Sequence, residues 1–191
     1  MKSRQNEVVP RSDRPLMSEG LSEVFLYMKG CDGLFREMRR QKQAISRQEC
    51  IDLLKSETRG VLAMAGDNGY PYCVPINHYY CEQDGKIYFH GGKIGHRVDA
   101  VKSCDKVCFT VYDKGFLKEG DWALNVKSVV VFGRMRIVED FDRAIELCRQ
   151  LSYKFTSDES YIDKEIKKCA KATLVMELEI EHMTGKLVNE K

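Results

Sequence analysis

Two turn signals between short alternating segments constrain this chain more than any other feature. Asp67-Asn68-Gly69 and Gln83-Asp84-Gly85 each separate segments in which apolar residues recur with period two. Asn-Gly tolerates positive φ at both central positions of a tight turn, so it favours a short hairpin connection. Residues 61–65, 72–81 and 86–90 are therefore expected to be consecutive antiparallel strands. Such a meander excludes a doubly wound parallel sheet, whose strands need long crossover connections.

The rest of the chain extends this pattern and adds helices. Further strands are expected at residues 106–113, 126–139 (with a bulge or bend at Gly133) and 173–182. Ser46-Arg47-Gln48-Glu49 is a capping box that predicts a helix of about ten residues, ended by Gly60. Later helices are expected at residues 98–103, 142–155 and 157–170. The sum is a mainly β fold: a β-barrel of about six strands with peripheral helices, one before the strands and two before the last strand.

Length and charge limit the class of protein. The chain has 191 residues, of which 43% are hydrophobic and 31% charged, as in one ordinary globular domain. We expect residues 1–37 to be a mobile N-terminal extension with a short helix near residues 22–28, and residues 38–191 to be the domain. Lys plus Arg exceed Asp plus Glu by 31 − 29 = 2, which gives no reason to expect nucleic acid or membrane as a partner. Without an apolar export signal, a cytoplasmic location is expected.

Eight cysteines raise the question of disulfides or a metal. No CxxC motif is present, and most of the cysteines lie in apolar periodic segments, which is typical of free thiols in a reducing compartment. The closest potential metal cluster, Cys73, His78 and Cys81, lies along one predicted strand without the usual ligand spacing. We expect no metal site and no essential cysteine.

The predicted strand at residues 72–81 breaks a local rule because it contains Pro75. Proline cannot donate to a sheet ladder, so the strand is expected at a sheet edge or at a bulge. A free edge could bind the polar rim of a flat heterocycle through its backbone groups. Alternatively, the proline only blunts an edge strand against aggregation.

A glycine-rich turn, Gly91-Gly92-Lys93-Ile94-Gly95-His96-Arg97, leads into the predicted helix at residues 98–103. It matches neither the Walker loop nor GxGxxG. Glycines allow close backbone approach, a helix N-terminus follows, and Lys93, His96 and Arg97 supply cationic groups, so the turn has the chemistry of an anion site. The alternative is an ordinary solvated basic loop.

Several short motifs in order resemble the pyridoxamine 5′-phosphate oxidase-like superfamily, and within it the nitroimidazole-resistance (Nim-type) group. They are Met38-Arg39-Arg40, Gly60-Val61-Leu62-Ala63, Asn68-Gly69-Tyr70-Pro71-Tyr72-Cys73-Val74-Pro75-Ile76-Asn77, Ile87-Tyr88-Phe89-His90, Gly95-His96-Arg97, Val107-Cys108-Phe109, Ser128-Val129-Val130-Val131-Phe132-Gly133 and His182-Met183-Thr184-Gly185-Lys186. The resemblance covers residues 38–186.

The resemblance implies an FMN-binding split β-barrel that forms a homodimer with FMN at the subunit interface. Residues 122–131 are expected to form much of that interface. The implied FMN-binding residues are Tyr72, Cys73, Val74, Pro75, Ile76, Asn77, Phe89, His90, Lys93, Gly95, His96 and Arg97. The strand 72–77 would line the isoalloxazine, and His96 and Arg97 would bind the phosphate. Nim-type proteins often have histidine at the position of His90, which makes it the candidate catalytic residue.

The implied function is an FMN-dependent oxidoreductase that reduces small nitroaromatic compounds or similar electron acceptors, with a reduced nicotinamide as donor. The chain has no match to the oxidases' substrate-phosphate residues, which argues against pyridoxamine phosphate as substrate. A non-catalytic flavin-binding module is the alternative, as is a haem-binding module in the same barrel with His78 or His90 as ligand. Otherwise His78 is expected to be a half-exposed strand residue and His182 a structural one.

Overall fold

The structure is a computed structural model that describes residues 35–189. The compact unit that carries the fold begins at Met38. The helix expected at residues 22–28, and most of the expected N-terminal extension, lie outside the described residues.

Eight strands and four α-helices make up the described fold. The strands are β1 (Arg59–Ala65), β2 (Pro71–Asn77), β3 (Tyr79–Cys81), β4 (Lys86–Gly92), β5 (Lys106–Tyr112), β6 (Phe116–Leu117), β7 (Leu124–Ile137) and β8 (Thr173–Asn189). The helices are α2 (Arg47–Ser56), α3 (His96–Ser103), α4 (Phe141–Ser152) and α5 (Glu159–Cys169). The 3₁₀ turns are η1 (Gln41–Gln43), η2 (Asp67–Gly69) and η3 (Ala170–Ala172).

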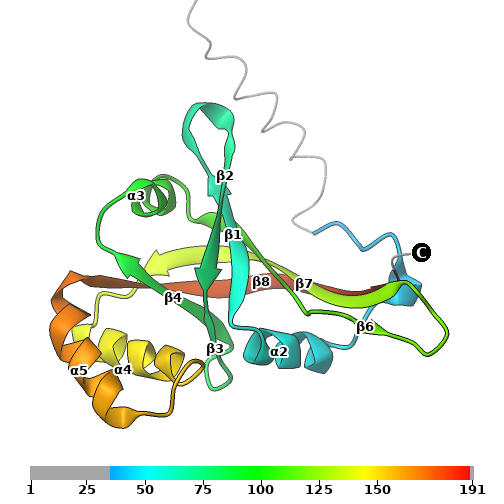
Figure 1. Cartoon of the computed structure of the whole chain (residues 1–191). Helices are drawn as coiled ribbons and strands as arrows, with labels where there is room; N and C mark the ends of the chain where they lie inside the picture. Colours follow the sequence, from blue (N-terminus) through cyan, green and yellow to red (C-terminus); the bar gives the residue numbers. More distant parts are fainter. Residues whose placement is uncertain (1–34, 190–191) are drawn as a thin grey trace, which may run out of the picture. The chain divides into compact units, whose positions relative to one another are not determined.

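The strands form one antiparallel sheet in the order β2-β1-β5-β7-β8-β4-β3, and β6 pairs with β7. The sheet curls so that β2 and β4 approach each other, but no ladder joins them. The barrel is therefore split between these two strands (Figure 1). The predicted mainly β split barrel with peripheral helices is confirmed, and so is the edge position that Pro75 indicated for β2.

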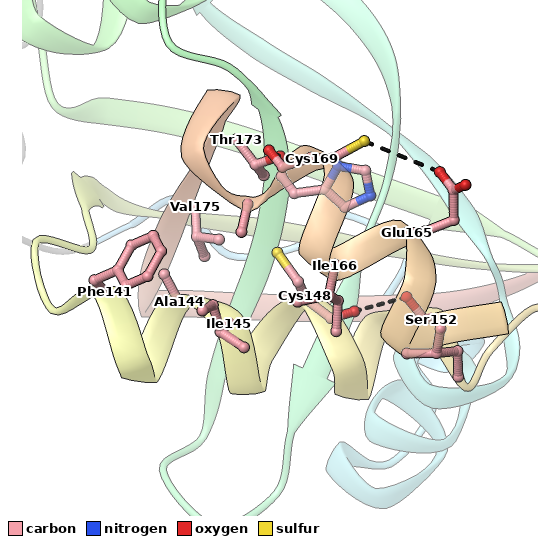
Figure 2. Close-up of a pocket in the computed structure, with 13 residues that line it drawn as sticks. Phe141, Ala144, Ile145, Cys148, Ser152, Glu165, Ile166, Cys169, Thr173 and Val175 are labelled. Carbon is pink, nitrogen blue, oxygen red and sulfur yellow. Dashed lines mark hydrogen bonds between the residues drawn. The ribbon is translucent and has the colours of Figure 1, made fainter. Parts of the chain in front are cut away.

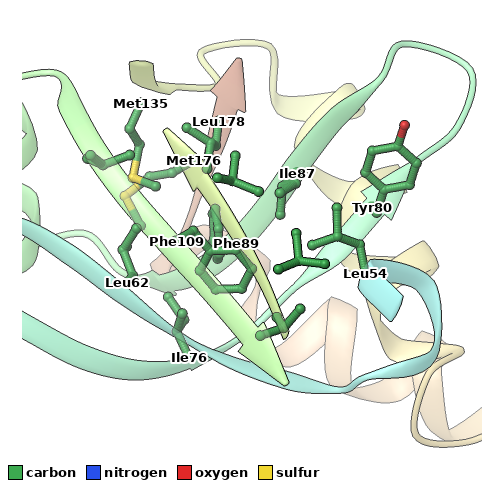
Figure 3. Packing of buried hydrophobic residues seen from close by; sticks show 14 of the residues in the cluster. Leu54, Leu62, Ile76, Tyr80, Ile87, Phe89, Phe109, Met135, Met176 and Leu178 are labelled. Carbon is green, nitrogen blue, oxygen red and sulfur yellow. The ribbon is translucent and has the colours of Figure 1, made fainter. Parts of the chain in front are cut away.

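The main hydrophobic core fills the inside of the curled sheet (Figure 3). Phe89 of β4 meets Phe109 of β5 edge to face, with ring centroids 5.0 Å apart, and both rings are fully buried. Leu54 of α2 closes the same core at one end. Each fully buried side chain of this size stabilises the fold by about 1.5–3 kcal/mol.

Helix α4 covers the other face of β3, β4 and β8 and forms a second, smaller cluster there. Leu147 of α4 packs in this cluster with Tyr88 and Val175. Residues on β4 and β8 therefore alternate between two apolar environments instead of between core and solvent. This is why Val175 is buried although it lies on the face of β8 opposite Met176.

Three local predictions are confirmed. The Ser46 side chain accepts from the backbone N–H of Glu49, and the Glu49 carboxylate accepts from the backbone N–H of Ser46, which completes the capping box. Asn68 and Gly69 both have positive φ, at 55° and 78°. A register shift between β7 and β8 falls at Phe132/Gly133, where the bulge was expected.

The single strand predicted at residues 72–81 is wrong, because the chain changes partner at His78. β2 pairs with β1, whereas β3 pairs with β4. Between them His78 is fully buried, not half-exposed as expected, and its Nε2 lies 2.9 Å from the backbone carbonyl oxygen of Leu54. The contact ties the strand break to the C-terminal turn of α2.

Several element ends also differ from the prediction, and α3 begins at His96 instead of residue 98. Helix α2 ends at Ser56, and Gly60 lies inside β1, where a Cβ would overlap the Phe109 ring. The glycine therefore makes room for a core ring instead of ending a helix. The last strand continues beyond residue 182 to Asn189, because β7 supplies a partner along that length.

No helix within residues 35–189 is long and apolar enough to cross a membrane.

Candidate functional site

The split between β2 and β4 holds the basic turn that the sequence marked as an anion site. Arg97, in the first turn of α3, packs against Gly91 so closely that a Cβ on Gly91 would overlap the Arg97 Nη2 atom. Tyr72 of β2 is close enough to act electrostatically on the Arg97 guanidinium. The guanidinium group therefore lies between the two strands that no ladder joins.

Arg97 lacks the partner that a half-buried cation normally has. Its Nε is buried without a hydrogen-bond acceptor, and no carboxylate in the described part of the chain pairs with it. Burial lowers the pKa of the guanidinium, although arginine stays charged at neutral pH. A buried cation without a counter-charge is costly, so the site favours an anionic ligand.

The N-terminus of α3 adds backbone donors beside this cation. Gly95 is the N-cap residue, with φ of 122°, a conformation that residues with a side chain rarely adopt. No side chain caps the helix, and the Val98 amide donates to the Gly95 carbonyl oxygen, so the amides of His96 and Arg97 are the ones available to an anion. Lys93 in the preceding loop is exposed. The expected convergence of glycine backbone, helix N-terminus and arginine is thus present.

His96 has a different setting from Arg97. Its ring stacks on the ring of Tyr72, with centroids 3.9 Å apart and planes 19° from parallel. Its Nε2 lies 3.5 Å from Asp67 Oδ2, in the turn between β1 and β2. His96 therefore connects α3 to the β1–β2 hairpin and holds Tyr72 beside the split.

The side chains of β2 alternate between the core and the outer face. Tyr72 and Val74 are half-buried against the core and Ile76 is buried within it, whereas Cys73 and Pro75 are exposed. The alternation leaves the strand's unpaired backbone edge next to the split. The Ile76 side chain is buried in the core, so for this residue only the backbone could face a ligand there.

His90 of β4 points to the side opposite Phe89, into a cavity of about 240 Å³. The cavity lies between α4, α5 and the outward face of β4 and β8 (Figure 2). The side chain is solvent-accessible, yet surrounding protein atoms lower the pKa of His90, and the positive charge of Arg97 lowers it further. The imidazole is therefore mostly neutral at pH 7 and can both donate and accept a hydrogen bond.

The structure brings together only some of the residues predicted for the site. At the split, the Tyr72 ring stacks on His96 and interacts electrostatically with Arg97. Gly95 lies at the start of the same helix, and His90, whose pKa Arg97 lowers, is one residue from Gly91. Phe89 is buried in the core, so its ring faces away. Asn77 lies at the far end of β2, where its Oδ1 accepts a hydrogen bond of 3.0 Å from Arg59 Nε.

The cysteines lie apart from this convergence. All seven described cysteines are free. Cys73 is exposed on the outer face of β2, and burial raises the pKa values of Cys108 and Cys148, which keeps these thiols protonated at neutral pH.

The sequence profile of the family described as pyridoxamine 5′-phosphate oxidase matches residues 46–187. The chain belongs to this family. The match spans the split barrel from α2 to β8, so it includes the Arg97 site and both later helices. No curated protein is significantly similar to this family member in sequence.

Solved structures show the same fold at low sequence identity. A putative 5-nitroimidazole antibiotic resistance protein from Bacteroides thetaiotaomicron is 21% identical, with a TM-score of 0.65, over 76% of this chain and 87% of that one. A FAD-binding protein from Mesorhizobium loti is 24% identical, with a TM-score of 0.57, over 76% and 97%. A FAD and heme binding protein from Mycobacterium smegmatis is 21% identical, with a TM-score of 0.62, over 78% and 74%. These likenesses show the split-barrel fold.

Sequence reasoning missed the cavity beside His90. Its walls come from two helices and a strand that are far apart in the chain from β4. The helical spacing of residues 142–155 and 157–170 indicated apolar faces, but it could not show that the faces leave a space between them.

Proposed function

We propose that this family member binds FMN in the split between β2 and β4 and acts as a Nim-type oxidoreductase. The supporting observation is the half-buried Arg97 guanidinium, which has a buried Nε without a partner and lies beside the uncapped N-terminus of α3. A phosphate monoester supplies the negative charge and the acceptor oxygens that this arrangement lacks.

The residues around Arg97 fit the rest of a flavin. Gly91 leaves the space that the guanidinium occupies, and the unpaired edge of β2 offers backbone donors and acceptors to a polar ring edge. His96 and Tyr72, stacked on each other, form one wall beside that edge. The phosphate would bind Arg97 and the amides of α3, and the isoalloxazine would lie along β2.

Bound FMN would carry the electrons, while the protein would supply position and electrostatics. His90 is the side chain best placed to assist, because it stands one residue from Gly91 and its lowered pKa leaves it mostly neutral at pH 7. It would hydrogen-bond flavin or substrate. The acceptor would be a small nitroaromatic compound, and the donor a reduced nicotinamide.

A homodimer would complete the site. On the outer face of the sheet, Pro75, Val61, Thr110 and Val130 are aligned across β2, β1, β5 and β7. Trp122, before β7, is 78% exposed. Exposed apolar surface on a sheet face is typical of a protein interface. A second copy placed here would cover the open side of the split.

The haem alternative requires an accessible ligand. His78 is fully buried and its Nε2 contacts the Leu54 carbonyl oxygen, so only His90 remains from the two candidates. A non-catalytic flavin-binding module would bind FMN in the same site. It would differ from the proposed oxidoreductase only in that it does not reduce a substrate.

The absorption spectrum of the purified full-length protein, before and after incubation with FMN, tests the cofactor. We expect flavin maxima and a stoichiometry of one FMN per subunit. A Soret band would replace the proposal with the haem alternative, and protein that takes up no flavin would refute it.

Anaerobic turnover tests the activity. Flavin-loaded protein is mixed with a reduced nicotinamide and a 5-nitroimidazole, and nitro absorbance is followed. Loss of nitro absorbance that depends on both protein and FMN supports the reductase. Full flavin occupancy without turnover would favour the non-catalytic module.

A further inference from the structure

The cavity between α4, α5 and the β4–β8 face has no part in the proposed phosphate site. Its volume of about 240 Å³ is below the roughly 300–1,000 Å³ of pockets for drug-sized ligands. It therefore has room for a molecule of one or two rings. Figure 2 shows Ala144, Ile145 and Cys148 of α4 on one side and Glu165 and Ile166 of α5 on another.

The walls of this cavity are mainly apolar, and most of their polar groups are already satisfied. Ile145, Ile166 and Val175 supply aliphatic surface. The Ser152 hydroxyl donates to the Cys148 carbonyl oxygen at 2.8 Å, and the Thr173 hydroxyl donates to the Cys169 carbonyl oxygen at 2.9 Å. These hydroxyl hydrogens are therefore not available to a ligand.

His90 is the polar wall group that stays available. No hydrogen bond joins its ring to another residue in the described range 35–189. It enters the cavity from β4, one residue before Gly91, on which Arg97 packs. The His90 imidazole is therefore the group of the cavity wall that lies next to the proposed flavin site.

Little net charge faces the cavity. The neutral imidazole of His90 and the protonated thiol of Cys148, whose pKa burial raises, carry none. The Glu165 carboxylate lies 3.7 Å from the Lys168 ammonium, which offsets its charge. An anionic molecule would instead be attracted to Arg97, which packs on Gly91.

We propose that this cavity binds an uncharged, flat heteroaromatic molecule of one or two rings, whose polar edge hydrogen-bonds His90 and whose faces pack between α4 and α5. That the molecule is the electron acceptor rests on the proposed function. The binding itself rests only on the cavity.

Three probes of similar size and different charge test the ligand class: benzimidazole, benzoate and benzamidine. Each is titrated at pH 7.5 into full-length protein saturated with FMN, and binding is followed by NMR through the histidine ring protons. We expect benzimidazole to bind at least about tenfold more tightly than the two charged probes. We also expect it to shift the His90 resonances.

Two tryptophan variants on α5 locate the binding. Ile166→Trp fills the cavity, whereas Tyr161→Trp changes an exposed residue of the same helix that does not line it. We expect Ile166→Trp to weaken benzimidazole by about tenfold or more, and Tyr161→Trp to leave it unchanged. Thermal unfolding and FMN absorbance of both variants show whether the fold and the flavin site are retained.

The outcomes separate this proposal from the proposed function. Absence of binding by all three probes, tightest binding by either charged probe, or equal effects of the two variants would overturn the cavity assignment even if FMN binds. If the protein takes up no FMN but benzimidazole still binds and responds to Ile166→Trp, the flavin proposal fails and the cavity assignment stands.

Discussion

Arg97 shows how one residue can depend on a neighbour that has no side chain. The space that its guanidinium fills exists because residue 91 is glycine, and the first amides of α3 have no side-chain acceptor because Gly95 is the N-cap residue. The proposed phosphate site therefore needs two glycines as much as it needs the cation.

Replacing Arg97 with alanine is expected to weaken FMN binding by about tenfold to a hundredfold. Charge-assisted hydrogen bonds contribute about 1.5–3 kcal/mol each, and about 1.4 kcal/mol is tenfold in affinity. Riboflavin lacks the phosphate, so its weaker binding should change little. Fluorescence titration with both flavins measures the difference. Equal losses for FMN and riboflavin would mean that Arg97 supports the fold instead.

Gly91→Ala tests the same site without removing the cation. Its Cβ would overlap only the flexible end of Arg97, so the guanidinium should move while the sheet is retained. We expect FMN binding to weaken by less than in Arg97→Ala, with a similar midpoint of thermal unfolding. Unchanged FMN affinity in titration would show that the phosphate does not need the guanidinium in this position.

His78 makes the stability of the protein depend on acid. Burial, and next the charge of Lys154, lower its pKa from the ordinary 6.5 to about 3. Between these values the unfolded chain binds the proton and the folded one does not. The free energy of unfolding should therefore fall as pH drops from 6.5 towards 3, by up to about 1.4 kcal/mol per pH unit.

His78→Gln is expected to flatten this acid dependence while keeping a donor for the Leu54 carbonyl oxygen. Urea unfolding at several pH values between 4 and 8 measures the slope for both proteins. Parallel slopes in the variant and the parent would contradict a neutral, buried His78.

At the scale of elements, Gly133 lets the two longest strands stay paired. A Cβ there would overlap the carbonyl oxygen of Glu179 on β8, at the register shift between β7 and β8. The glycine thus combines the bulge with continued pairing on both sides of it.

Gly133→Ala should destabilise the protein by about 1–3 kcal/mol, because the backbone of β8 must move to admit the methyl group. Gly92→Ala is a matched control at the end of β4, where the nearest atom to a new Cβ is 3.9 Å away. Urea denaturation compares the two. Similar stabilities would show that the β7–β8 ladder adapts without strain.

At the scale of the whole molecule, the split in the barrel and the outer face of the sheet both favour association with a second copy of the chain. A single copy leaves the β2 edge unpaired and the aligned row of Pro75, Val61, Thr110 and Val130 uncovered. The proposed homodimer covers both.

Val130→Asp is expected to turn the dimer into a monomer and to lower FMN occupancy, because the substitution places a charge at the β7 end of this row. Ser157→Asp, in the exposed connection between α4 and α5, should change neither. Light scattering at micromolar concentration and flavin absorbance are the two readouts. A parent protein that is monomeric with FMN bound would refute the dimer.

The sequence by itself determined those features whose interacting groups are close along the chain. The Ser46 capping box, the Asn68-Gly69 turn and the anion-site character of the Gly91–Arg97 turn depend on hydrogen bonds and φ angles within a few residues. Pro75 placed β2 at an edge because proline lacks a backbone donor. The family motifs then predicted the barrel.

Only the tertiary structure decided which residues are buried by segments that are distant in the sequence. His78 is buried because α2 brings the Leu54 carbonyl to it from 24 positions away, and that contact breaks the predicted strand in two. Phe89 and His90 are neighbours in sequence, yet one enters the core and the other a cavity, because α4 and α5 cover the second face of β4. Burial and packing space are properties of several segments together, so no local pattern contains them.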